Sequence, residues 1–236
     1  MTKGERLQHA SLLVSFVVLV VTGFMLRYPE ASWIVLLRKV WGNLFEARSV
    51  IHRVSGVVMV VASVGHIYYL AFTVRGREFL RDMMPRPGDW GDVVAALRYY
   101  AGLRRERPRF GRFSYIEKSE YWALVWGTAV MAGTGVVLWF QDPAIALLSK
   151  LGWDAARSIH YYEAILATLA IVVWHLYFVI FNPDVYPMNL AWLKGTITEE
   201  EMEDEHPLEL EAIRRKQQEE AEARRAAEAK RGEGDA

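Results

Sequence analysis

Four long stretches of this 236-residue chain contain no charged residue and are mostly apolar. They are residues 9–26, 54–74, 121–140 and 164–181, each 18 to 21 residues long. A helix of about 20 apolar residues is long enough to cross the hydrocarbon core of a bilayer. Helices of a soluble bundle keep one polar face, and these stretches have none. The pattern therefore predicts an all-α membrane protein with a bundle of four transmembrane helices, and it disfavours a soluble bundle.

Shorter helical patterns lie between the predicted spans. Residues 31–47 and 142–153 carry apolar side chains at helical spacing, which predicts short amphipathic helices at the outer membrane surface. Another short helix is expected near residues 89–102. The end of the chain is charged throughout, as in a solvated helix or a disordered arm. We therefore divide the chain into a membrane domain, residues 1–198, and a charged cytoplasmic tail, residues 199–236. No repeat period is evident.

Lysine and arginine are distributed unevenly among the segments outside the spans. Residues 75–118 hold eleven of them and the segment after residue 181 holds eight, whereas residues 27–48 hold four and residues 141–157 hold two. Because basic segments stay on the cytoplasmic side, both termini and the central loop are predicted to be cytoplasmic. The formal net charge is +0, so the composition gives no reason to expect a nucleic-acid partner.

The chain has no cysteine, which excludes disulfides, iron–sulfur ligation and covalent attachment of haem. Five of its six histidines fall within the predicted spans or at their edges. Ionisable residues in a membrane are costly and tend to mark function, although a single histidine is as often a structural residue bonded across helices. The five candidate ligands are His9, His52, His66, His160 and His175.

The spacing of four of these histidines predicts two sites at different depths. His52 and His66 are 14 residues apart, and His160 and His175 are 15 apart, so each pair lies on roughly one helix face. In the predicted topology His52 and His160 share the outer level, while His66 and His175 share the inner level. Two imidazoles per level are too few for zinc but suit an iron with four porphyrin nitrogens. The pattern predicts two stacked haem groups. Arg53, beside the outer pair, is a candidate for a haem propionate contact or an interfacial anchor.

These motifs resemble a known family. RLQH near the start of the first span, His-x13-His in the second and His-x14-His in the fourth resemble the di-haem cytochrome b subunits of the bacterial cytochrome b561 superfamily. That group includes the gamma subunit of formate dehydrogenases and the cytochrome b of nickel–iron hydrogenases. The likeness covers roughly residues 5–198. It implies a location in the bacterial inner membrane, two haem b groups, and exchange of electrons with menaquinone or ubiquinone.

The ligands of the inner haem stay open at this point. The formate dehydrogenase type implies that His9 pairs with His175, whereas the helical spacing favours His66 with His175. The remaining histidine would then contact a propionate, line a quinone pocket or belong to a third haem.

The function that the sequence favours is electron transfer between a quinone pool and a partner oxidoreductase. The resemblance implies a partner subunit such as a multihaem cytochrome c or an iron–sulfur or catalytic subunit, and it favours a periplasmic one. No catalytic residue is assigned in this chain. Two alternatives belong to other classes: a membrane anchor or assembly subunit with structural histidines, and a proton channel or transporter that uses them as relays.

Overall fold

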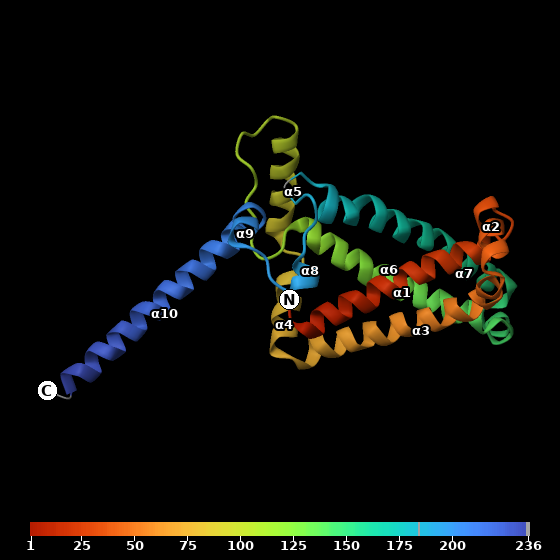
Figure 1. Ribbon diagram of the computed structural model, residues 1–236, viewed down its shortest axis with the longest axis horizontal. Helices are drawn as coiled ribbons and strands as arrows, with labels where there is room; N and C mark the ends of the chain where they lie inside the picture. Colours follow the sequence, from red (N-terminus) through yellow and green to blue (C-terminus); the bar gives the residue numbers. More distant parts are fainter. Residues whose placement is uncertain (184, 235–236) are drawn as a thin grey trace. The chain divides into compact units, whose positions relative to one another are not determined.

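The computed structural model describes residues 1–183 and 185–234, and all regular structure within them is helical. The last two residues of the predicted tail lie outside this range. The predicted all-α class is confirmed (Figure 1). The elements are α1 (Lys3–Arg27), α2 (Ser32–Val40), α3 (Gly42–Phe72), α4 (Val74–Met83), α5 (Pro87–Tyr100), α6 (Tyr115–Trp139), α7 (Gln141–Leu169), the π-helices η1 (Ala170–His175) and η2 (Tyr177–Phe181), α8 (Ala191–Lys194), α9 (Glu199–Glu205) and α10 (Pro207–Gly234).

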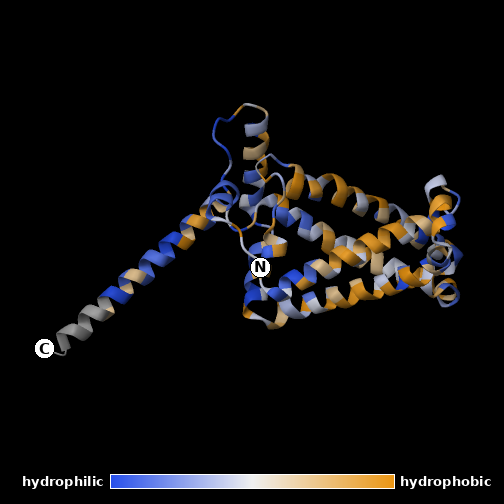
Figure 2. Cartoon of the chain, viewed as in Figure 1, coloured by the Kyte–Doolittle hydropathy of each residue, from blue (hydrophilic) through white to orange (hydrophobic). Residues whose placement is uncertain are grey.

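Four helical segments are long and apolar enough to cross a bilayer: Lys3–Arg27, Phe45–Phe72, Tyr115–Trp139 and Gln141–Phe181. Their most apolar 18-residue windows have mean hydropathies between 1.5 and 2.4, yet no more than 17% of any window is buried. Apolar residues run along all four helices (Figure 2). A soluble bundle would turn such surface inward. The exposed apolar surface therefore faces lipid, and the predicted four-helix membrane bundle is confirmed.

The first and third spans begin with the same hydrogen-bonding pattern. Thr2 accepts a hydrogen bond from the Glu5 amide at 3.2 Å, and the Glu5 carboxylate accepts one from the Thr2 amide at 2.7 Å. Ser114 and Glu117 make the equivalent pair of contacts at 3.4 and 2.8 Å before α6. Each capping box satisfies amides that the first helical turn leaves unpaired. These caps fix where the two apolar helices start.

The connection between the first two spans differs from the prediction. Only residues 32–40 form the separate short helix α2, which buries Ile34 against Met25 and Phe45. Helix α3 starts at Gly42, so the second half of the predicted surface helix is continuous with the second span. Nothing in residues 42–48 interrupts the helical hydrogen bonds, and the break falls at Trp41, which has φ −132° and ψ 62°.

The fourth span is not a plain α-helix. It begins at Gln141, and its backbone is interrupted at Ser149, with φ 65° and ψ 169°. This break falls inside the predicted surface segment, residues 142–153, whose last residues continue into the span. From Ala170 to Phe181 the backbone forms π-helix, broken only at Leu176. A π-turn takes up more residues than an α-turn, so it changes the face on which later side chains lie. His175, at the end of η1, is one of the residues affected.

The described chain forms two compact units. One comprises residues 1–80 and 120–196, and contains the membrane histidines and the four spans, apart from the first residues of α6. The other joins residues 81–119 to the tail from residue 197. In the second unit, the Phe110 carbonyl accepts a hydrogen bond from the Leu208 amide at 3.1 Å, and Lys118 donates one to Asp89 at 2.7 Å. Burial raises the pKa of Asp89, but the bonds from Lys118 and Arg86 outweigh burial and hold that pKa below its usual range.

Candidate functional site

The outer pair of histidines lies face to edge across the bundle. His52 on α3 and His160 on α7 have ring centroids 6.4 Å apart and ring planes 68° apart. Two imidazoles that hold one metal ion from opposite sides have ring centres about 6 Å apart, because each metal–nitrogen bond is about 2 Å long. The separation of this pair therefore fits one shared metal ion.

The tautomer of His52 is fixed by a threonine on α1. Thr22 Oγ1 lies 3.0 Å from His52 Nδ1 and also donates its hydroxyl hydrogen to the Val18 carbonyl at 2.6 Å. A hydroxyl has one hydrogen to donate, so Thr22 accepts from the Nδ1–H of His52. This leaves Nε2 of His52 unprotonated, and Nε2 makes no hydrogen bond to any described residue. The result is a nitrogen lone pair available to a metal.

His160 is held in the same way by α6. Thr134 Oγ1 lies 2.9 Å from His160 Nδ1 and donates to the Val130 carbonyl at 2.7 Å. Nε2 of His160 is likewise without a hydrogen bond to the described residues. Metal-bound histidines usually donate their second ring N–H to an acceptor that fixes ring orientation. Both outer histidines have this acceptor.

Two glycines let the outer rings lie close to the helix backbones. A Cβ at Gly23 would stand 3.4 Å from Cε1 of His52, and one at Gly135 would stand 3.5 Å from Cε1 of His160. Both are ordinary van der Waals distances, so a methyl group would just fit, whereas a side chain larger than alanine would meet the ring. The glycine beside each threonine therefore leaves room for the histidine that the threonine orients.

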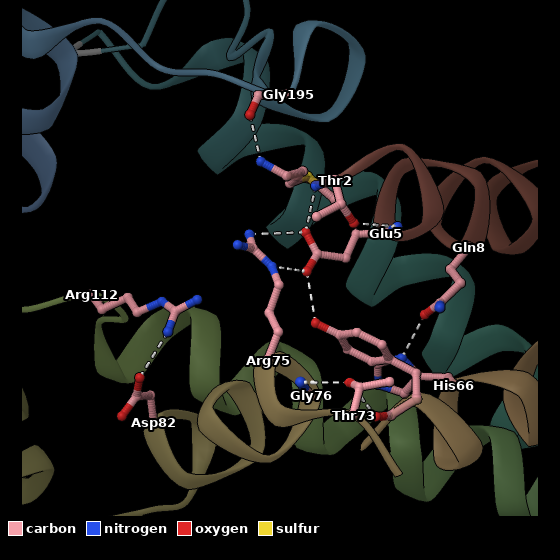
Figure 3. A network of polar contacts seen from close by, with 12 residues as sticks. Thr2, Glu5, Gln8, His66, Thr73, Arg75, Gly76, Asp82, Arg112 and Gly195 are labelled. Atoms are coloured by element: carbon pink, nitrogen blue, oxygen red, sulfur yellow. Dashed lines mark hydrogen bonds and ion pairs between the residues drawn. The ribbon is translucent and has the colours of Figure 1, made fainter. Parts of the chain in front are cut away.

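His66, predicted at the inner level, has both ring nitrogens in use. Its Nδ1 lies 2.8 Å from the amide oxygen of Gln8, which only accepts, so Nδ1 carries the hydrogen (Figure 3). Its Nε2 lies 3.1 Å from the hydroxyl of Tyr121, which donates to it. The ring contacts of His66 are with Tyr69, Phe79 and Tyr121. His66 is a satisfied polar residue in this arrangement.

His175 bonds Glu120, and no hydrogen bond or ring contact joins it to His66 within the described chain. The Nδ1 of His175 is 3.1 Å from Oε2 of Glu120, and its Nε2 makes no hydrogen bond within the described chain. His9 and His175 are close enough to interact electrostatically, and the His9 ring packs 5.6 Å from Trp192. Nδ1 of His9 and Oε1 of Glu120 are both buried without a hydrogen-bond partner. Buried polar atoms without a partner are uncommon in folded proteins, and a group bound beside His9 and Glu120 is one explanation for these two.

A polar cluster surrounds the start of α1 (Figure 3). Glu5 accepts hydrogen bonds from the Tyr69 hydroxyl at 2.7 Å and from Arg75 Nε at 2.6 Å. The bond to Glu5 raises the pKa of Arg75, which therefore stays charged. The amine of Met1 donates to the Gly195 carbonyl, so the chain after the fourth span lies beside the chain start. This cluster was not predicted from the sequence, because Tyr69 and Arg75 lie 64 and 70 positions from Glu5 and belong to no motif.

Arg53 directs its guanidinium over the Trp139 ring, 5.3 Å from the ring centroid. Its role toward a propionate stays a prediction.

Within residues 1–183 and 185–234, no group of three or more His, Cys, Asp or Glu side chains is placed to hold a metal ion. At the outer site the protein therefore offers two imidazole nitrogens. Two such ligands fit an iron whose other ligands come from a porphyrin.

A protein-family model described as prokaryotic cytochrome b561 matches residues 1–188, which include all four spans and the five membrane histidines. The chain belongs to the prokaryotic cytochrome b561 family. As a member of the family it is a multi-pass membrane cytochrome of the b type, which binds haem b and serves in electron transfer. The predicted resemblance is thereby confirmed. No curated protein matches the chain in sequence.

Proposed function

We propose that this cytochrome carries electrons across the bilayer through two haem b groups, one held by His52 and His160 and the other by His9 and His175. The observation that carries the proposal is the outer pair: two opposed imidazoles 6.4 Å apart, each with Nδ1 bonded and Nε2 free of hydrogen bonds to the described residues. At the inner level, helical spacing favours His66 as the partner of His175. We propose His9 instead, because both ring nitrogens of His66 are already bonded.

Haem iron, when bound, supplies reversible one-electron chemistry. The residues of the chain orient and insulate it. Thr22 and Thr134 keep the hydrogens of the outer imidazoles on Nδ1, so that Nε2 faces the site. Glu120 does the same for His175, and as a carboxylate it makes that imidazole a more basic ligand than a hydroxyl would.

The two sites lie at different depths in the membrane. His160 and His175 are 15 residues apart on one continuous helical segment, a rise of roughly 22 Å for an α-helix. The π-helical turns shorten this separation somewhat, because they take up more residues per turn. Two sites separated in this way divide the passage across an apolar layer about 30 Å thick into shorter steps. This arrangement supports transfer between the two faces of the membrane.

We propose that the exchange partners are a quinone, menaquinone or ubiquinone, and a redox partner subunit. Family membership supports a partner of the kind the sequence analysis considered, a multihaem cytochrome c or an iron–sulfur or catalytic subunit. The charge distribution supports a bacterial inner membrane location with both termini in the cytoplasm. The contact between Met1 and Gly195 agrees with both ends of the bundle lying on one side.

The haem content of the purified full-length chain tests the proposal. We expect a reduced-minus-oxidised spectrum of the b type with two haems per chain. His52→Ala should leave one haem, as should His160→Ala. His206→Ala is the matched control, because His206 bonds the Gly111 carbonyl in the other unit and should not change the count. A colourless chain would overturn the proposal and favour the anchor or proton-channel alternatives.

A further inference from the structure

The contacts of the membrane histidines occur twice, at a constant spacing along the chain. On α1, Gln8 bonds His66, Thr22 bonds His52, and Gly23 lies against His52. On α6, the residues 112 positions later make the corresponding contacts. Glu120 bonds His175, Thr134 bonds His160, and Gly135 lies against His160. This identical spacing of three contacts indicates that α6 repeats α1.

The local structure of the two helices repeats at the same spacing. The capping pair Thr2 and Glu5 precedes Ser114 and Glu117 by 112 positions. The two threonine hydroxyls donate to the carbonyls of Val18 and Val130, again 112 positions apart. The repeat is not evident from the sequence alone, because most of the aligned residues are interchangeable apolar side chains.

The second helix of each pair repeats as well. Residues 66–72 read HIYYLAF and residues 175–181 read HLYFVIF. The offset is 108 positions between His52 and His160 but 109 between His66 and His175. The π-helix η1 lies between His160 and His175, and its wider turns take up the additional residue. His175 thus keeps the same relation to α6 that His66 has to α1.

Helices α1 and α3 form one half of the bundle, and α6 and α7 form the other. The contacts between these halves follow the pattern of a two-fold symmetric dimer. In such a dimer, residue i contacts j and residue j contacts i. His52 pairs with its own equivalent, His160, so the outer site lies where the two halves meet. His9 and His175 have Tyr121 and His66 as equivalents, since Tyr121 follows His9 by 112 positions. The Tyr121–His66 pair is itself in contact.

We infer that the inner level contains two equivalent places for a ligated haem, and that Tyr121 determines which one is used. The inference rests on the proposed haem ligation by His9 and His175. At the second place the Tyr121 hydroxyl donates to Nε2 of His66, and Gln8 accepts from Nδ1, so every polar atom of the ring is paired. At the first place the corresponding residue is His9, and Nε2 of His175 has no hydrogen bond to a described residue. Tyr121 is thus a positioning residue, which acts through His66.

The inference is tested by removing His9 from α1 and placing a histidine at the equivalent position of α6, residue 121. His9→Ala in the full-length chain should lower the content from two haems to one. Adding Tyr121→His should restore the second haem, now with His66 as its partner. In that double variant His66→Ala should remove the restored haem and His175→Ala should not, the reverse of their effects in the unaltered chain. The restored haem should give the low-spin spectrum of bis-histidine ligation.

Several results would overturn the inference. One is a double variant that keeps only the outer haem, identified by its unchanged spectrum, which also shows that the bundle is folded. Another is a restored haem that still depends on His175. Tyr121→Phe is the conservative control: it should retain two haems, and loss of the inner haem would show that Tyr121 belongs to the site that holds it. If the unaltered chain itself lacks two haems, the proposed function fails instead.

Discussion

His66 and His175 have corresponding positions in the two halves of the membrane bundle, yet their ring nitrogens are used differently. His66 is bonded at Nδ1 by Gln8 and at Nε2 by Tyr121, whereas His175 is bonded only at Nδ1, by Glu120. Their spacing from the outer histidines differs by a single residue. Helical position therefore brings a histidine to the right depth, and the neighbours on the other helices decide whether it is available to a metal.

The neighbours of the two histidines also differ in polarity. Around His66 the uncharged groups Gln8 and Tyr121 pair with both ring nitrogens. Around His175 the acceptor is a carboxylate, and two buried polar atoms, Nδ1 of His9 and Oε1 of Glu120, have no partner. The first set is complete in itself, and we propose that the second holds a bound group. Each of the following predictions tests this difference.

Removal of haem should have the largest effect. Without iron, Nε2 of His175 becomes an unpaired polar atom in the membrane, whereas His66 keeps both of its bonds. We expect amide hydrogens in η1 and η2 to exchange roughly tenfold faster in the apoprotein, with a smaller change around His66. Hydrogen-exchange mass spectrometry of the full chain in detergent measures both regions. Equal protection in the two forms, or a protease-resistant apoprotein, would contradict the account.

Glu120→Ala should weaken binding of the inner haem by about 10- to 100-fold, as is usual when the acceptor behind a metal-bound histidine is lost. Gln8→Ala removes the corresponding acceptor from His66 and should leave both haem affinities unchanged. Haem titration of the two apoproteins, followed by absorbance, gives the affinities. The account predicts a clear difference between the two variants, so equal losses in both would refute it.

Thr22→Val and Thr134→Val should each lower the affinity of the outer site by roughly tenfold, since a hydroxyl acceptor is weaker than a carboxylate. Because the two halves are equivalent at this level, the two effects should be of similar size. Ser15→Ala is the matched control: Ser15 is buried on α1, and within the described chain its hydroxyl bonds only backbone carbonyls of α1, with Ser11 at 2.7 Å. A loss confined to one threonine would break the proposed equivalence.

Tyr121→Phe should have the smallest effect. It leaves Nε2 of His66 without a donor, which costs about 1 kcal/mol for a partly buried group. We expect a slightly lower thermal midpoint with an unchanged spectrum. A thermal melt monitored at the haem absorbance, compared with Tyr68→Phe on the exposed face of α3, measures the difference. A shift in the midpoint as large as that of Glu120→Ala would mean that Tyr121 supports a haem directly.

Much of the fold follows from the sequence, because apolar runs of bilayer length leave few alternatives. The four spans, the all-α class and the family were all predicted, and His52 and His160 do lie opposite each other as their depth suggested. The extent of α3 and the π-helix in the fourth span were not predicted. Both depend on local backbone geometry, for which the apolar residues around Ala170 give no signal.

The inner site was less predictable, for a different physical reason. Ideal helical geometry places His66 and His175 at one depth, but it does not say which hydrogen bonds each ring makes with other helices. The residues that decide are Gln8, Tyr121 and Glu120, each of them more than 50 positions from the histidine it contacts. Equivalent residues of α1 and α6 are 112 positions apart, and this offset relates the contacts of the two halves. It becomes visible only when the contacts of both halves are compared.

The haem content of His66→Ala, measured on the purified full-length chain, tests the central claim most directly. If a histidine with both nitrogens bonded takes no part in ligation, the variant should retain two haems per chain and the unaltered b-type spectrum. One haem per chain in this variant would show that His66 is a ligand after all, and the account of the inner site would be wrong.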